Sequence, residues 1–328
     1  MKKILFPVTL ALLLAVGCSK QVSPEERDIP ISLDVRLEGS TKATHEDAGT
    51  IKDLDFIVRD KSNSKYSFSS TRFYPDGGKW VSDIQRLWQG KMFAVDMLAL
   101  SPSVPTRELS ISDENSSPLF SWEVESVQTS GSYASDLLYT WKSNSTPPNI
   151  SDVSAAGFSI GLKHAMSLLK INVTLATEFN AEVVPHSCPL EYLSIDGLKR
   201  KGEYYNYIPY STWEGIELRP VVGSEGSINS YMKSYTPSAS DVETCSAVYE
   251  CILLPQQPTS FTVKAGTSIK EVIFTPTLAS GFTFEAGKYY TLNLKVGKDK
   301  IEMDGGISAS AWTPFERGDL NLDDESTN

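Results

Sequence analysis

The chain has 328 residues, of which 40% are hydrophobic and 22% charged, and 30 basic against 41 acidic side chains give a formal net charge of −11. A chain of this length and apolar content has material for about two domains with buried cores. The acidic balance argues against nucleic acid as a partner, because binding a phosphate backbone requires clustered Lys and Arg side chains. With only 3 His residues, the chain also offers few ligands for a zinc site.

The first residues have the pattern of an export signal. Two Lys residues precede an apolar run over residues 4–16, which is shorter than the roughly 20 residues that span a bilayer. Small residues then precede Cys18, and this arrangement resembles the lipobox of bacterial lipoproteins. We therefore predict a signal peptide over residues 1–17, attachment of acyl chains such as palmitate to Cys18, and a polar tether over residues 18–30. The alternative is an ordinary secretory signal with an incidental Cys.

Strict alternation marks the first strand after the tether. Ile31, Leu33, Val35 and Leu37 alternate with polar residues, which predicts a half-buried strand over residues 31–37. Further strands are expected over residues 54–59, 91–100 and 122–125. Pro and small polar residues between 143 and 156 indicate a boundary. We place an N-terminal β-sandwich domain at residues 31–150 and a C-terminal one, with an acidic tail, at residues 151–328.

The second half also has the pattern of short strands. Residues 158–175 are expected to be strand throughout, because the alternation and the β-branched residues outweigh the helical composition of residues 162–170. Further strands are predicted over residues 191–195, 248–254, 260–263, 271–274, 289–296, 300–303 and 307–312. Gly residues separate them, and no helix of useful length is indicated. The pattern favours an all-β chain of sandwiches.

The sequence offers little material for catalysis. It contains no nucleophile elbow, P-loop, dinucleotide fingerprint or metalloprotease motif. We therefore predict no enzyme, no cofactor and no metal site, and we interpret His164 as a hydrogen-bonded structural residue. Cys188, Cys245 and Cys251 are expected to be buried or free thiols, and a bridge between Cys245 and Cys251 is the less favoured alternative.

Several segments resemble, in order, those of the Bacteroidetes fimbrillins, the superfamily of type V pilins and associated subunits. Residues 162–173 (LKHAMSLLKINV) resemble the strand that opens the second fimbrillin domain. Residues 252–256 (ILLPQ), 284–294 (FEAGKYYTLNL) and 307–312 (ISASAW) resemble later segments of that domain. In the first half, residues 31–43 and 93–99 match. Together with the lipobox, these segments cover most of the chain.

The resemblance implies a fold and a role. The fold is two β-sandwich domains of transthyretin-like or Greek-key type. The role is a lipoprotein of the outer membrane that assembles with other subunits into a surface fimbrium and supports adhesion. Assembly proceeds by donor-strand exchange: a protease removes the N-terminal strand, and a strand from a neighbouring subunit, usually C-terminal, fills the groove that is left.

Particular residues of this chain match those roles. The detachable strand carries Ile31, Leu33, Val35 and Leu37, and the candidate cleavage residues are Arg36 first, then Lys42, then Arg59. The candidate donor strand lies within residues 307–322. The residues that it would insert are Ile307, Ala309, Ala311, Leu320 and Leu322.

Alternatives stay open at this point. Residues 307–312 are otherwise simply the last strand of their own domain. A subunit that is not processed would be a terminal component such as an anchor, because its groove stays filled by its own strand. A monomeric surface lipoprotein that binds a glycan or a host ligand is the alternative function, and the sequence does not separate stalk, tip and anchor subunits.

Overall fold

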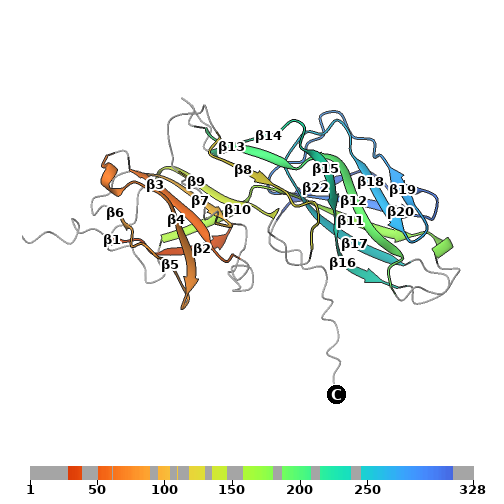
Figure 1. Ribbon diagram of the computed structural model, residues 1–328, viewed down its shortest axis with the longest axis horizontal. Coiled ribbons are helices and arrows are strands. Elements are labelled where there is room, and N and C mark those ends of the chain that lie inside the picture. Colours follow the sequence, from red (N-terminus) through yellow and green to blue (C-terminus); the bar gives the residue numbers. More distant parts are fainter. Residues whose placement is uncertain are drawn as a thin grey trace, which may run out of the picture.

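A computed structural model of the chain describes residues 29–38, 51–60, 62–88, 95–103, 109, 118–129, 135–145, 158–179, 187–207, 215–237 and 245–312. Within these ranges the secondary structure is strands, joined by two single-turn 3₁₀ helices, η2 (Ser64–Tyr66) and η4 (Thr177–Phe179). The strands gather into two groups that lie end to end along the long axis (Figure 1). No helix among the described residues has the length and apolar content that crossing a bilayer requires.

The N-terminal group closes into a barrel in which β10 and β2 are neighbours. The order around it is β10, β2, β5, β4, β3, β7 and β9. The pair of β2 and β10 is parallel, whereas the other neighbours are antiparallel. A separate ladder joins β1 to β6. The bounds are β1 (Ile29–Pro30), β2 (Leu33–Leu37), β3 (Leu54–Asp60), β4 (Phe68–Asp76), β5 (Lys79–Ser82), β6 (Leu87–Trp88), β7 (Val95–Ser101), β9 (Leu138–Ser145) and β10 (Phe158–His164).

The C-terminal group contains two larger sheets. One has the order β16, β17, β11, β20 and β21, with β22 also beside β20, and the other has the order β15, β12, β18 and β19. Alternate residues of β11 are buried, as period-two patterning requires. The bounds are β11 (Ser167–Leu175), β12 (Leu190–Lys199), β15 (Glu225–Asn229), β16 (Tyr231–Thr236), β17 (Ser246–Leu253), β18 (Thr262–Thr267), β19 (Glu271–Phe274), β20 (Lys288–Val296), β21 (Ile301–Met303) and β22 (Ser308–Ala311).

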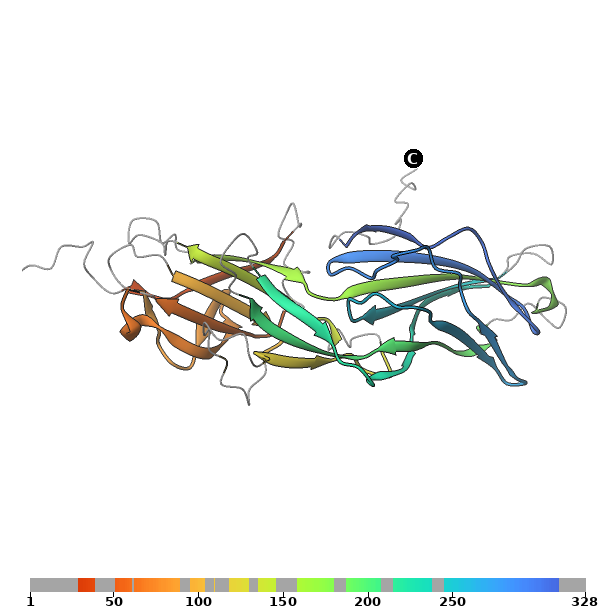
Figure 2. The same ribbon diagram turned by 90° about the horizontal axis from the view of Figure 1, so that it is seen from above.

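A small third sheet bridges the two groups. In it β8 (Phe120–Glu123) pairs with β13 (Lys201–Tyr207), which pairs with β14 (Gly215–Pro220). The rings of Phe120 and Tyr204 stack with centroids 4.6 Å apart and planes 5° apart. β14 also lies against barrel strand β9, and Figure 2 shows this sheet between the two groups. The sheet therefore joins β8, from the N-terminal half of the chain, to the pair β13 and β14 from the C-terminal half.

Strands β3 and β7 are buried on both faces, and this joins the two hydrophobic cores. Phe56 and Met97 point into the barrel core. Ile57, Leu98 and Leu100 lie on the other face, in the core of the C-terminal sheets. Such strands have near-continuous apolar sequences because neither face meets water. One wall of the barrel is thus also part of the second core.

The all-β prediction is confirmed, and several predicted strands agree closely with observed ones. Residues 54–59 and 271–274 correspond to β3 and β19. The prediction of one strand over residues 158–175 was wrong: β10 ends at His164 and β11 begins at Ser167, because the chain leaves the barrel there and enters the larger sheet. Sequence analysis did not identify β4, β5, β9 or β13 to β16.

The predicted domain boundary, between residues 150 and 151, lies outside the described residues. β10, which follows it, pairs with β2 and β9 of the barrel. The arrangement as two sandwich domains of transthyretin-like or Greek-key type stays a prediction.

The shared wall generates a prediction about stability. Leu98 is 0% exposed, so Leu98→Ala should lower the free energy of unfolding by about 2–5 kcal/mol, since it leaves a cavity between the two cores. Ile84 is 58% exposed, and Ile84→Ala should change the stability by less than about 0.5 kcal/mol. Urea unfolding followed by tryptophan fluorescence measures both. Equal effects of the two substitutions would contradict the shared wall.

Candidate functional site

β2, the strand expected to detach, is held by its backbone mainly on one side. It pairs with β10 over five residues in parallel register, whereas toward β5 only Leu33 and Trp80 pair. Ahead of the strand, the amide of Ile31 donates to the carbonyl of Arg86 at 2.8 Å. The ladder with β10 therefore sets the register of β2.

The apolar face of β2 lies in the barrel core. Ile31, Leu33 and Val35 are 9%, 1% and 4% exposed, and Leu37 is half-buried at the edge of the same cluster. Burying a side chain of this kind contributes about 1.5–3 kcal/mol before costs. The buried side chains of Leu33 and Val35, with Ile31 just ahead of the strand, thus hold β2 in place, and removing the segment would expose apolar surface beside β10.

The basic residues near β2 differ in their surroundings. The Arg36 side chain is 56% exposed and forms an ion pair with Asp34, with the closest atoms 2.6 Å apart. Its backbone lies within the ladder, opposite Gly161 of β10. Arg59 lies within β3, a largely buried strand. Lys42 and the predicted lipidation residue Cys18 lie outside the described residues.

The C-terminal strand β22 is held mainly by its backbone. It pairs with residues 288–291 of β20, and all four of its residues, Ala309 and Ala311 among them, are exposed. Ile307, just before it, packs partly against the core. In this structure β22 is therefore the last strand of its own sheet, and Leu320 and Leu322 lie outside the described residues.

Trp312 fixes the end of β22 to the junction of the two groups. Its ring stacks on the imidazole of His164, with centroids 3.7 Å apart and planes 8° apart. The Nδ1 atom of His164 is 2.8 Å from a carboxylate oxygen of Asp136, and both side chains are largely buried. A carboxylate only accepts hydrogen bonds, so Nδ1 carries the proton of this contact. The amide of Trp312 also donates to the carbonyl of Gly287 at 2.9 Å.

β10 contacts both β2 and Trp312. Residues 158–162 pair with β2, and His164 at the end of the same strand contacts Trp312. The strand expected to detach, β2, and the candidate donor segment, which contains Trp312, thus both contact β10. Sequence analysis treated His164 as structural, and it did not connect that residue with Asp136 or Trp312, because none of the spacings indicates that they meet.

The three described cysteines are not joined by disulfides. Cys188, Cys245 and Cys251 form no disulfide, and the last two are buried. Burial raises the pKa of the Cys251 thiol to about 12, so this thiol stays protonated and unreactive at neutral pH. The less favoured bridge between Cys245 and Cys251 is absent from the structure.

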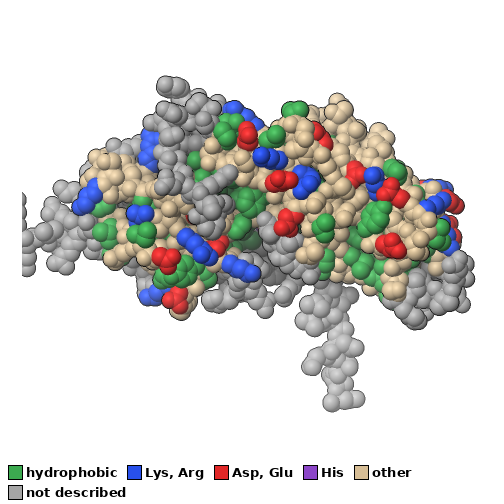
Figure 3. Space-filling model, viewed as in Figure 1, with side chains coloured by type: hydrophobic (Ala, Val, Ile, Leu, Met, Phe, Trp, Pro, Cys, Tyr) green, Lys and Arg blue, Asp and Glu red, His purple; other side chains and the backbone are tan. Residues whose placement is uncertain are grey.

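The described surface has no single dominant charge on the face shown in Figure 3, where acidic and basic side chains are interspersed. Ion pairs such as Arg219 with Glu217 and Lys233 with Glu250 bring opposite charges together in the described part of the chain. In the described part of the chain, no three His, Cys, Asp or Glu side chains form a group suited to a metal ion.

A comparison with protein families places most of the chain in one of them. The model of the fimbrillin-like family matches residues 37–312. No curated protein matches the chain.

Solved structures share the fold at low sequence identity. A candidate cell adhesion protein from Bacteroides uniformis is similar with a TM-score of 0.56 and 13% identity, over 87% of this chain and 99% of that one. A second such protein, from Bacteroides ovatus, has a TM-score of 0.52 and 11% identity, over 89% and 99%. The tip fimbrial protein Mfa3 from Porphyromonas gingivalis, with C-terminal truncation, has a TM-score of 0.50 and 12% identity, over 87% and 100%.

The contact of Trp312 with His164 generates a prediction about the C-terminal strand. An aromatic pair contributes about 0.5–1.5 kcal/mol beyond burial. Trp312→Ala should therefore speed hydrogen exchange of the β22 amides by up to about tenfold, while the amides between β11 and β17 keep their rates. Ser310→Ala, on the same exposed strand, should leave all rates unchanged. Unaltered exchange in Trp312→Ala would show that β22 is held without the stack.

Proposed function

Because the chain belongs to the fimbrillin-like family, we propose that it is a lipid-anchored subunit of a surface fimbrium that assembles by donor-strand exchange and supports adhesion. The observation that carries the assembly step is the position of β2. β2 and Ile31 just ahead of it insert three buried side chains into the barrel core, and the strand depends for its backbone pairing almost entirely on β10. A strand held in this way can be replaced by another that offers the same pattern.

The geometry specifies what a replacement strand needs. Loss of β2 leaves the β10 edge over residues 158–162 without its partner, and unpaired backbone groups beside an exposed apolar groove are unfavourable. An incoming strand that restores this ladder runs parallel to β10 and inserts an apolar side chain at every second residue. No enzyme activity is part of this role.

The two parts of the candidate donor segment carry side chains of different size. Ala309 and Ala311 have smaller side chains than Leu33 and Val35, so they would leave space in the groove. Leu320 and Leu322 have the same spacing and larger side chains. We therefore infer that Leu320 and Leu322 are the inserting residues of the 307–322 segment. β22 either stays paired with β20 or detaches together with these residues.

Two cleavage residues are compatible with loss of β2. Arg36 has an exposed side chain, but its backbone lies in the ladder, so cleavage there requires local release of β2. Lys42 follows the strand in the sequence, so a cut after it breaks no bond within the ladder, and β2 must then be displaced from β10. Without cleavage the groove stays filled, and the subunit would act as a terminal anchor.

The assembly proposal predicts the outcome of limited proteolysis. The purified full chain should stay monomeric until a protease cuts after residue 36 or 42, and should then form ladders that resist detergent in unheated gels. Arg36→Gln combined with Lys42→Gln should abolish the ladders. Arg72→Gln replaces another exposed Arg of the barrel and should polymerise as the natural chain does.

Two results would contradict strand exchange. One is a ladder formed while residues 31–35 are still attached. The other is a folded monomer that persists after these residues are lost, which would favour the alternative of a monomeric surface lipoprotein.

The membrane anchor is tested separately. Cys18→Ala should abolish incorporation of labelled palmitate and release the protein from the outer-membrane fraction, since acyl chains supply the attachment. Cys188→Ala, which removes a thiol in the folded part, should leave both labelling and fractionation unchanged. Palmitate label that persists in Cys18→Ala would contradict the assignment of the anchor.

A further inference from the structure

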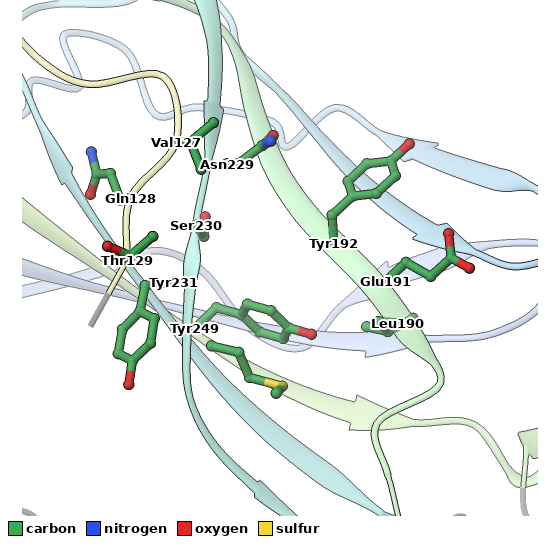
Figure 4. A pocket seen from close by; sticks show the side chains of 11 residues that line it. Val127, Gln128, Thr129, Leu190, Glu191, Tyr192, Asn229, Ser230, Tyr231 and Tyr249 are labelled. Atoms are coloured by element: carbon green, nitrogen blue, oxygen red, sulfur yellow. The ribbon is translucent and has the colours of Figure 1, made fainter. Parts of the chain in front are cut away.

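A hollow of about 410 Å³ lies in the C-terminal group, apart from the barrel strands discussed above. We name it the tyrosine pocket, after Tyr192 of β12, Tyr231 of β16 and Tyr249 of β17. The 127–129 segment, which follows β8, forms another side of it. In Figure 4 Tyr249 lies between Tyr231 and Leu190. The volume falls within the range of small-ligand sites, about 300–1,000 Å³.

The walls of the pocket are fixed by hydrogen bonds within the chain. The side-chain amide of Gln128 donates to the carbonyl of Ile252 at 2.9 Å, and its oxygen accepts from the amide of Ile252 at 2.7 Å. The amide of Gln128 donates to the carbonyl of Asn229 at 3.1 Å. The Tyr192 hydroxyl donates to the Glu271 carboxylate. The pocket is therefore preorganised, and binding a ligand would cost little conformational entropy of the lining residues.

Two irregularities in strand pairing border the pocket. The register of β12 against β18 shifts between Leu190 and Tyr192, and that of β16 against β17 shifts between Met232 and Ser234. Such irregularities change the direction of side chains and are common beside binding sites. Here they lie next to the pocket on two different sheets.

The lining combines apolar and aromatic surface with hydroxyl and amide groups. Val127 and Met232 are 56% and 40% exposed, so solvent reaches apolar side chains directly beside the tyrosines. Thr129 and Asn229 add polar groups. Because Tyr249 is 2% exposed, the aromatic surface open to a ligand is that of the half-buried Tyr192 and Tyr231. Such a surface next to groups of this kind suits a ligand that has an apolar face and several hydroxyls.

The charges of the lining restrict the ligand further. Glu191 is the one charged residue among those that line the pocket, and no Lys, Arg or His lines it. The whole chain has a net charge of −11. Acidic ligands are therefore disfavoured, because a carboxylate close to them repels them and no cation compensates.

We propose that the tyrosine pocket binds a neutral saccharide. The sugar presents a C–H face to the rings of Tyr192 and Tyr231, and its hydroxyls bond to polar side chains of the lining other than Gln128, whose amide is already bonded to Ile252. The pocket belongs to the C-terminal sheets and not to the barrel. Binding is therefore independent of the removal of β2 and of assembly.

Saturation-transfer NMR on the purified full chain tests this proposal with lactose, cellobiose, maltose and chitobiose as probes, each at millimolar concentration. At least one of them should receive saturation, and N-acetylneuraminic acid should receive none. Tyr231→Ala should weaken the binding about tenfold, the loss expected for one aromatic contact. Tyr74→Ala, a matched substitution on barrel strand β4, should leave the affinity unchanged.

Several outcomes would overturn the proposal. They are the absence of transfer to all four neutral sugars, equal affinity in Tyr231→Ala and the natural chain, and transfer only to the acidic sugar. Transfer to an uncharged extended pentapeptide, with none to the sugars, would assign the pocket to peptides instead. Because the test uses uncleaved monomer, failure of strand exchange would not affect it.

Discussion

The parallel pairing of β2 with β10 is the interaction on which the account depends. This pairing makes a short alternating segment one of the strands of a closed barrel, between β10 and β5. The segment has a continuous backbone ladder with β10 only. Burial of Ile31, Leu33 and Val35 supplies the stability, and the β10 ladder supplies the register. The strand thus combines deep burial with one-sided pairing, which is the combination that the proposed strand exchange requires.

β10 also relates the barrel to the rest of the molecule. Its end carries His164, which contacts Asp136 and Trp312, and two residues later the chain enters β11 of the large sheet. The doubly buried strands β3 and β7 and the bridging sheet of β8, β13 and β14 join the two groups further. The two groups are therefore joined by packed side chains and backbone pairing as well as by the chain itself.

Local patterning predicted the fold class because several strands, β2, β11 and β20 among them, alternate apolar and polar residues. The strand predicted over residues 31–37 was placed from apolar periodicity and is observed over 33–37, whereas 271–274 was placed from a short run of apolar residues. β4 and β13 to β16 could not be placed in this way, since they carry many polar residues, and their pairing rather than their composition makes them strands. The change of sheet at Ala165 and Met166 was also beyond local patterning, because the sequence alternates on both sides of it. The contact of His164 with Trp312 joins residues far apart in the chain, and no spacing rule indicates it.

The most direct test of the central claim is the N-terminal residue of subunits taken from the shaft of the assembled fimbria, determined by mass spectrometry. Strand replacement predicts that these subunits begin after Arg36 or Lys42, so that Ile31, Leu33 and Val35 are missing from every internal copy. Internal subunits that still begin at Cys18, with β2 attached, would contradict it.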